Sequence, residues 1–139
     1  MPGLLIAVAI LAVAAVAGLI WRSRSGRVRA PGPAGPVRVP SGVLPEVSGA
    51  GTLLQFSSPT CAPCRQVRAT CAGLAEGLTG VRHVEIDVEE RLDAARALNV
   101  WRLPTLLVVD REGRVVRRAV GVPDRAELQA AVTEVLATC

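Results

Sequence analysis

Two cysteines separated by two residues are the side chains best suited to covalent chemistry in this sequence of 139 residues. They lie in the run Thr60-Cys61-Ala62-Pro63-Cys64, at the predicted start of a helix that follows a strand. The helix dipole and the free N–H groups of the first turn favour a thiolate on Cys61 and lower its pKa. Cys64, one turn later, is close enough to attack a mixed disulfide at Cys61. Pro63 costs no hydrogen bond at this early helical position.

The elements that must position these cysteines alternate between strand and helix patterns. In order, we predict a strand at 52–57, a helix at 61–78, a strand at 81–87, a helix at 89–98, a strand at 103–110, a strand at 114–120 and a last helix from Asp124. The first three elements form a right-handed parallel unit, and the last two strands form an antiparallel hairpin. The sequence therefore predicts an α/β domain with a four-stranded mixed sheet and helices on both faces.

This order of elements resembles the thioredoxin family over about residues 52–136. The motifs that carry the resemblance are the Cys-Ala-Pro-Cys site, Asp87 at the end of the second strand, Leu103-Pro104-Thr105 before the third, and Gly121 after the hairpin. The resemblance implies a thioredoxin-like fold with a cis peptide bond before Pro104, facing the dithiol. It also implies that the backbone of Leu103 docks an extended substrate, with Pro104 and Thr105 shaping that surface.

Three departures from the family pattern affect the predicted site. Gln55 stands six residues before the first cysteine, where thioredoxins keep a buried acid. Because an amide cannot accept the proton of the resolving thiol, we expect slower resolution or a specialised partner. Ser57 and Thr60 replace aromatic residues and make the rim more polar. Trp101, close to Pro104 in sequence, is a candidate aromatic contact for substrate.

The remaining candidate ligands and thiols favour ordinary structural roles. A zinc site needs four ligands, and the chain's single histidine, His83, lies on a predicted strand, so no metal is expected. Cys71 lies about two helical turns beyond Cys64, too far to bridge it, and is interpreted as a small buried hydrophobe. Cys139 is interpreted as a mobile terminal thiol. The acidic run at 85–90 is interpreted as a solvated strand end and helix start.

An apolar segment precedes the domain. Residues 2–21 carry no charged side chain and are long enough, as a helix, to cross a bilayer core of about 30 Å. Trp21 ends the run where an aromatic ring suits the headgroup region. A cleaved signal peptide is the rival interpretation, but the basic n-region that it requires is absent from the sequence. We predict a single-pass transmembrane anchor at residues 1–21.

Residues 22–46 are rich in Arg, Pro and Gly, and are predicted to be a semi-extended tether before a domain at 47–139. Four arginines follow the apolar run closely, which favours a cytoplasmic domain by the positive-inside rule, with an extracytoplasmic one as the alternative. From residue 39 onward, eleven arginines face twelve acids. Without a cationic excess, and with few aromatics, the domain is not expected to bind nucleic acid.

Together these features predict a membrane-tethered thiol–disulfide oxidoreductase that reduces protein disulfides through Cys61 and Cys64. Its partners are a protein disulfide substrate and an upstream electron donor, both unidentified, and no cofactor is expected beyond the dithiol itself. Two alternatives stay open from the sequence. One is a thioredoxin-like adaptor module at a membrane complex with little turnover, and the other is thiol-based metal handover.

Overall fold

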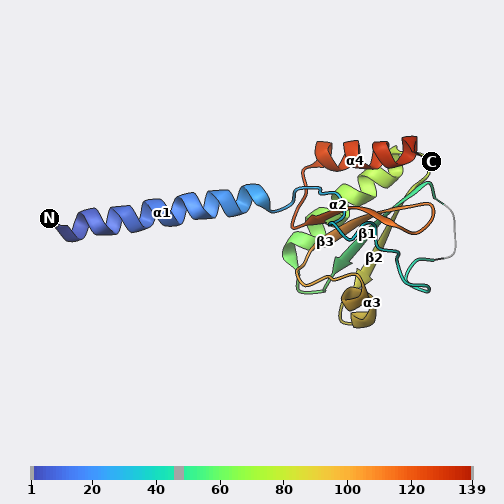
Figure 1. Cartoon of the computed structure of the whole chain (residues 1–139), viewed down its shortest axis with the longest axis horizontal. Helices are drawn as coiled ribbons and strands as arrows, with labels where there is room; N and C mark the ends of the chain where they lie inside the picture. The colour runs from blue at the N-terminus through green and yellow to red at the C-terminus, as the bar shows by residue number, and fades with distance from the viewer. Residues whose placement is uncertain (1, 46–48, 139) are drawn as a thin grey trace.

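A computed structural model describes residues 2–45 and 49–138, and shows a long helix projecting from a domain of strands and helices (Figure 1). The elements are α1 (Pro2–Arg24), β1 (Gly51–Ser57), α2 (Ala62–Gly77), β2 (Val81–Asp87), α3 (Leu92–Ala97), β3 (Thr105–Asp110), β4 (Val115–Val120) and α4 (Arg125–Ala137). The predicted order of strands and helices is confirmed.

The four strands form one mixed sheet in the order β2-β1-β3-β4. β1 pairs with β2 in parallel, whereas β3 pairs antiparallel with both β1 and β4. The two central strands are buried along almost their whole length, as expected for strands covered on both faces. This sheet, with its flanking helices, confirms the predicted fold class.

Alternation along β1 and β3 sends side chains into two hydrophobic cores, one on each face of the sheet. Helices α2 and α4 cover one face and α3 the other (Figure 1). The α2–α4 core includes Leu53, Val67, Cys71, Leu106, Val108, Leu128 and Val132. The α3 core includes Leu54, Phe56, Ala94, Leu98, Leu107 and Val109. The α2–α4 core packs α2 against β1 through side chains such as Val67 and Leu53.

Two elements start two or three residues later than the sequence predicts. Helix α3 begins at Leu92 instead of residue 89, because Asp87 first organises a turn in which its carboxylate accepts from the Glu89 N–H at 2.8 Å. The carbonyl of Asp87 also accepts from the Arg91 N–H at 3.0 Å. Strand β3 begins at Thr105 because the proline before it has no N–H to donate to a ladder.

Much of residues 26–43, within the predicted tether, packs against the domain. Arg29 and Arg118 exchange backbone hydrogen bonds of 2.7 and 2.8 Å, so the segment lies along the outer edge of β4. Val39 and Val43 are buried in the α3 core, with exposed fractions of 8% and 6%. The segment therefore covers a sheet edge and completes a core. The predicted boundary at residues 46 and 47 lies outside the described residues.

Helix α1 is long and apolar enough to cross a membrane, with a mean hydropathy of 2.8 over its most apolar window. None of that window is buried against the domain. A membrane anchor and a signal sequence near the N-terminus both have these properties.

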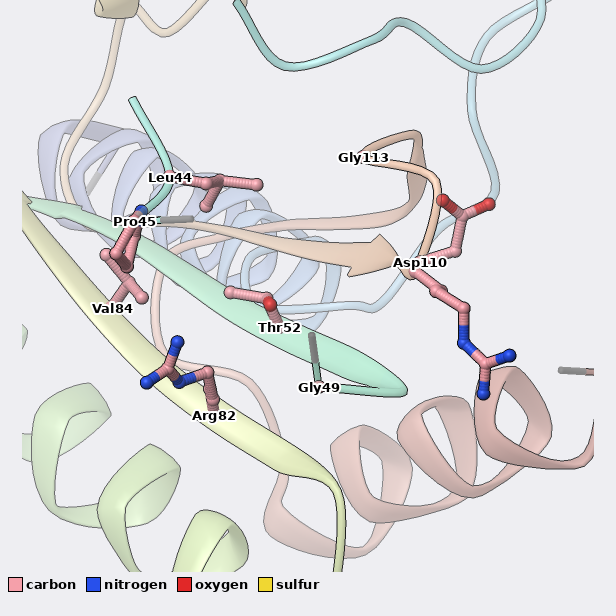
Figure 2. Close-up of a pocket in the computed structure, with 9 residues that line it drawn as sticks. Leu44, Pro45, Gly49, Thr52, Arg82, Val84, Asp110 and Gly113 are labelled. Atoms are coloured by element: carbon pink, nitrogen blue, oxygen red, sulfur yellow. The ribbon is translucent and has the colours of Figure 1, made fainter. Parts of the chain in front are cut away.

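A small pocket of about 150 Å³ lies at the end of β1 that is remote from the cysteines (Figure 2). Thr52, at the start of β1, and Asp110, at the end of β3, are among the residues that line it. The carboxylate of Asp110 is already bound by the Arg114 guanidinium at 2.8 Å. None of the predicted site residues lines this pocket, and the two cysteines follow the other end of β1.

Candidate active site around Cys61 and Cys64

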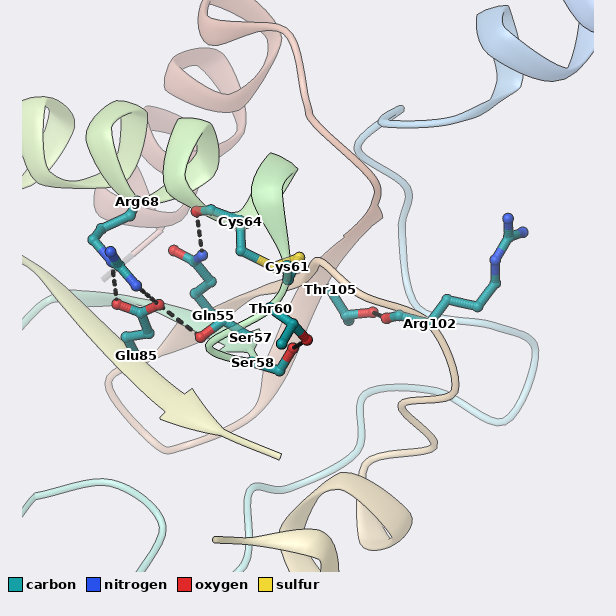
Figure 3. The surroundings of a disulfide bond; sticks show 10 residues. All are labelled: Gln55, Ser57, Ser58, Thr60, Cys61, Cys64, Arg68, Glu85, Arg102 and Thr105. Atoms are coloured by element: carbon teal, nitrogen blue, oxygen red, sulfur yellow. Dashed lines mark hydrogen bonds and ion pairs between the residues drawn. A yellow bond between two sulfur atoms is a disulfide. The ribbon is translucent and has the colours of Figure 1, made fainter. Parts of the chain in front are cut away.

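Cys61 and Cys64 form a disulfide at the start of α2, with their Cα atoms 5.4 Å apart (Figure 3). Cys61 is the N-cap of the helix and has extended backbone angles, and the proline that follows at 63 lies in the first turn. Cys61 is half-buried, whereas Cys64 is only 1% exposed. Cys61 is therefore the more accessible of the two cysteines, while Cys64 lies in the interior.

Directly beneath the disulfide, Gln55 on β1 joins the helix to the neighbouring strand. Its side chain is fully buried, and its Nε2 donates to the backbone carbonyl of Cys64 at 2.9 Å. Its Oε1 lies 3.0 Å from Nε2 of His83 on β2. Because an amide oxygen only accepts, the histidine must donate, which places a proton on Nε2. Burial lowers the pKa of His83, partly opposed by the nearby Glu85 carboxylate.

A second polar cluster connects β1, β2 and α2 beside this pair (Figure 3). Arg68 on α2 donates from Nε and a terminal nitrogen to the two oxygens of Glu85, at 2.6 and 2.7 Å. Ser57 Oγ donates to the same carboxylate at 2.6 Å. The hydrogen bond from Arg68 is the main cause that lowers the pKa of Glu85. Glu85 therefore anchors α2 to the sheet and is not the solvated residue that the sequence suggested.

The loop before β3 supplies the other side of the site. The Leu103–Pro104 peptide bond is cis. Pro104 is buried and its carbonyl accepts from the Gly121 N–H at 2.8 Å, while Leu103 stays half-buried. The buried Thr105 donates from Oγ1 to the Arg102 carbonyl at 2.6 Å, which closes the loop at its base.

The comparisons with known proteins agree with this geometry. The family model described as Thioredoxin matches residues 46–134. The chain belongs to the thioredoxin family. Among curated relatives of this thioredoxin-family chain, Thioredoxin H2 of Arabidopsis thaliana is 32% identical over 85 residues, covering 61% of the chain and 62% of the relative's length. Thioredoxin H-type of Ricinus communis is 30% identical over 86 residues, covering 62% and 71% respectively.

A solved structure extends the likeness to three dimensions. A thioredoxin variant from Halobacterium salinarum superposes with a TM-score of 0.58 at 27% identity, and the match covers 63% of this chain and 76% of that one. Neither the apolar helix α1 nor the segment along β4 falls within the residues that the family model matches. The part of the chain that matches the family is thus the sheet with α2, α3 and most of α4, which confirms a thioredoxin-type redox protein with a Cys-x-x-Cys pair.

The exposed residues beside the disulfide in this thioredoxin have small side chains. Thr60, Ala62 and Pro63 are exposed, and Thr60 Oγ1 lies 3.4 Å from the hydroxyl of Ser58. Trp101 is 77% exposed and hydrogen-bonded through its indole N–H to the Asn99 side chain. Trp101 is therefore a large exposed apolar side chain on the loop before β3.

Sequence reasoning missed His83, Glu85 and Arg68 as parts of the site. The signal that could have found them is the parallel register, in which Gln55 lies opposite Glu85 and Leu53 opposite His83. That register places both β2 side chains on the face of the sheet that α2 covers. Once β1 and β2 are paired, polar residues on that face need polar partners beneath the cysteines.

Cys71, the other cysteine among the described residues, takes no part in the disulfide. Cys71 is a free, fully buried cysteine in the α2–α4 core, and burial is the main cause that raises its pKa to about 12. Cys139 lies outside the described residues. Within residues 2–45 and 49–138, no cluster of three or more His, Cys, Asp or Glu side chains is placed to hold a metal ion.

Proposed function

We propose that this protein is a membrane-tethered thiol–disulfide oxidoreductase that reduces protein disulfides, with Cys61 as nucleophile and Cys64 as resolving thiol. The observation that carries the proposal is the difference in exposure between the two cysteines, since Cys61 is half-buried at the helix N-cap and Cys64 is 1% exposed. The free N–H groups of the first helical turn favour a thiolate at Cys61 over one at the buried position.

The exchange proceeds in two balanced steps. The Cys61 thiolate attacks one sulfur of the substrate disulfide, forming a mixed disulfide and releasing the other substrate sulfur as a thiolate. The Cys64 thiol then loses its proton and attacks Cys61, which forms the intramolecular disulfide and releases the second substrate thiol. Two electrons pass to the substrate disulfide. A dithiol donor must then supply two electrons to reduce the Cys61–Cys64 disulfide again.

Docking is assigned to the loop before β3. Leu103 is half-buried beside the cis proline, which leaves its backbone available to pair with an extended substrate segment. Trp101 and Thr105 are proposed to shape the same surface, together with the exposed rim at Thr60, Ala62 and Pro63. Thr105 acts through the backbone that it fixes, since its hydroxyl is bound to Arg102.

Gln55 affects how the Cys64 thiol loses its proton in the second step. Its amide holds the Cys64 backbone but cannot take the thiol proton, so the proton must leave by another route. Gln55→Asp supplies a titratable group at the same place and is expected to change the rate of mixed-disulfide resolution in stopped-flow. An unchanged rate would show that the residue at position 55 does not control this step.

Insulin reduction and mixed-disulfide trapping in cells test the proposal together. The full chain is expected to turn over insulin with a dithiol donor. Cys64→Ser is expected to accumulate mixed disulfides that the matched variant Cys61→Ser does not form. Absence of both turnover and trapping would instead leave an adaptor module with an idle disulfide. The trapped partner and its compartment would also report on which side of the membrane the domain lies, where the arginines after α1 favour the cytoplasm.

A further inference from the structure

A pocket of about 460 Å³ lies where the C-terminal end of α1 meets the loop before β3. Its charged lining consists of five arginines: Arg24, Arg27, Arg29, Arg102 and Arg118. The other lining residues are Trp21, Ser25, Ala30 and Val120, so no carboxylate is among them. The pocket is separate from the disulfide, and Figure 3 shows the Arg102 side chain pointing away from the two cysteines.

These arginines differ from four others on the domain. Arg68, Arg91, Arg114 and Arg117 each form an ion pair with an acidic side chain. Among the described parts of the chain, by contrast, none of the five pocket arginines is paired with a carboxylate. Arg118 donates to the Leu98 and Asn99 carbonyls and Arg27 to the Ser23 carbonyl, so these bonds leave their positive charges uncompensated. Like charges gathered in one concavity favour an anion from outside the chain.

The position of the pocket selects the kind of anion. Trp21 closes the apolar stretch of α1 and also lines the pocket, and the Arg102 guanidinium lies over its ring at 5.3 Å. If α1 spans a bilayer, Trp21 is at the headgroup level, and the arginines surround the space where lipid phosphates lie. Guanidinium groups match phosphate oxygens in a two-pronged geometry that lysine does not provide.

We propose that this pocket binds the phosphate of an anionic phospholipid headgroup. The inference rests on the membrane anchoring in the proposed function, but not on the redox activity. Free phosphate shares the chemistry of the ligand, and the lipid is favoured because the pocket wall includes the end of the membrane helix. A headgroup held at Arg102 also places the loop that contains Leu103 and Pro104 beside the bilayer surface.

The test uses the full chain reconstituted in phosphatidylcholine vesicles, with increasing amounts of phosphatidylglycerol. Trp21 fluorescence, in a Trp101→Phe background that leaves one tryptophan, reports occupancy of the pocket. We expect a saturable response to phosphatidylglycerol. Arg24→Gln combined with Arg29→Gln should weaken the apparent affinity for phosphatidylglycerol about 30-fold, which corresponds to about 1 kcal/mol for each arginine near a membrane surface. The matched double variant Arg96→Gln with Arg111→Gln removes the same charge from exposed sites outside the pocket. It should change the apparent affinity for phosphatidylglycerol less than about twofold.

Three results would overturn the proposal that the pocket binds a headgroup phosphate. They are no response to phosphatidylglycerol, an equal loss in the two charge-matched double variants, and saturation of the same site by inorganic phosphate in pure phosphatidylcholine. Flotation of the chain with pure phosphatidylcholine vesicles tests the anchor separately, and insulin turnover of the chain that retains Trp101 tests the redox function. A chain that floats and turns over insulin, but ignores phosphatidylglycerol, refutes the headgroup site alone.

Discussion

Truncating the buried amide beneath the disulfide should strongly destabilise the protein. Gln55→Ala removes the hydrogen bond to the Cys64 carbonyl at 2.9 Å and the one from His83 at 3.0 Å. Each contributes about 1 kcal/mol net. The side chain is fully buried, so its loss also leaves a cavity at a cost of about 1–2 kcal/mol. We therefore expect the free energy of unfolding to fall by about 3–4 kcal/mol.

Urea denaturation of the oxidised full chain in nonionic detergent, followed by circular dichroism, measures this change. Keeping the disulfide intact ensures that the comparison reports packing and hydrogen bonding, not redox state. Gln129→Ala is the matched control, because it makes the same chemical deletion at an exposed position of α4 and should change stability by less than about 0.5 kcal/mol. A loss below about 1 kcal/mol for Gln55→Ala would refute the argument that this amide holds α2 to the sheet.

Three further predictions follow from burial. Cys71 should resist alkylation in the native chain at neutral pH, because its pKa is raised to about 12, and should react after denaturation, as mass spectrometry can show. Burial lowers the folded-state pKa of His83 below its ordinary 6.5, so stability should fall as pH drops from 6.5 to that lower value. His83→Gln should flatten this part of the urea-midpoint profile, and an unchanged slope would contradict it. Val39→Ala should cost about 1–2 kcal/mol in the same assay, whereas Val37→Ala, at a 50% exposed position nearby, should cost much less.

The parts of the fold that sequence predicts well are those with local signals. The Cys-x-x-Cys pair, its helix and the apolar strand before it all lie within about 25 residues, and helical and alternating periodicity identify them directly. Helix α3 was predicted to start three residues too early because the turn at Asp87 depends on one side-chain hydrogen bond, which hydrophobic periodicity does not detect.

The parts that sequence missed depend on pairing between distant segments. Residues 26–43 attach to β4 mainly through backbone hydrogen bonds, and every residue type except proline can donate one, so composition carried no signal. The contact between Gln55 and His83 depends on the register of two parallel strands. Sequence placed each residue on its strand, and Gln55 at the position of the family's buried acid, but only the pairing shows that the Gln55 amide is held by a histidine.

The attachment of residues 26–43 also limits how far the dithiol can travel. If residues 22–45 were free and extended, they would let the domain range up to about 75 Å from the end of α1, at about 3.1 Å per residue. Instead α1 ends at Arg24, and the Gly26 N–H is already bound to the Val120 carbonyl, so one residue separates the helix from the domain. With α1 in a bilayer, the domain would be held at a short, fixed distance from the membrane. Only disulfides that approach within one domain's height of the lipid surface would be its substrates.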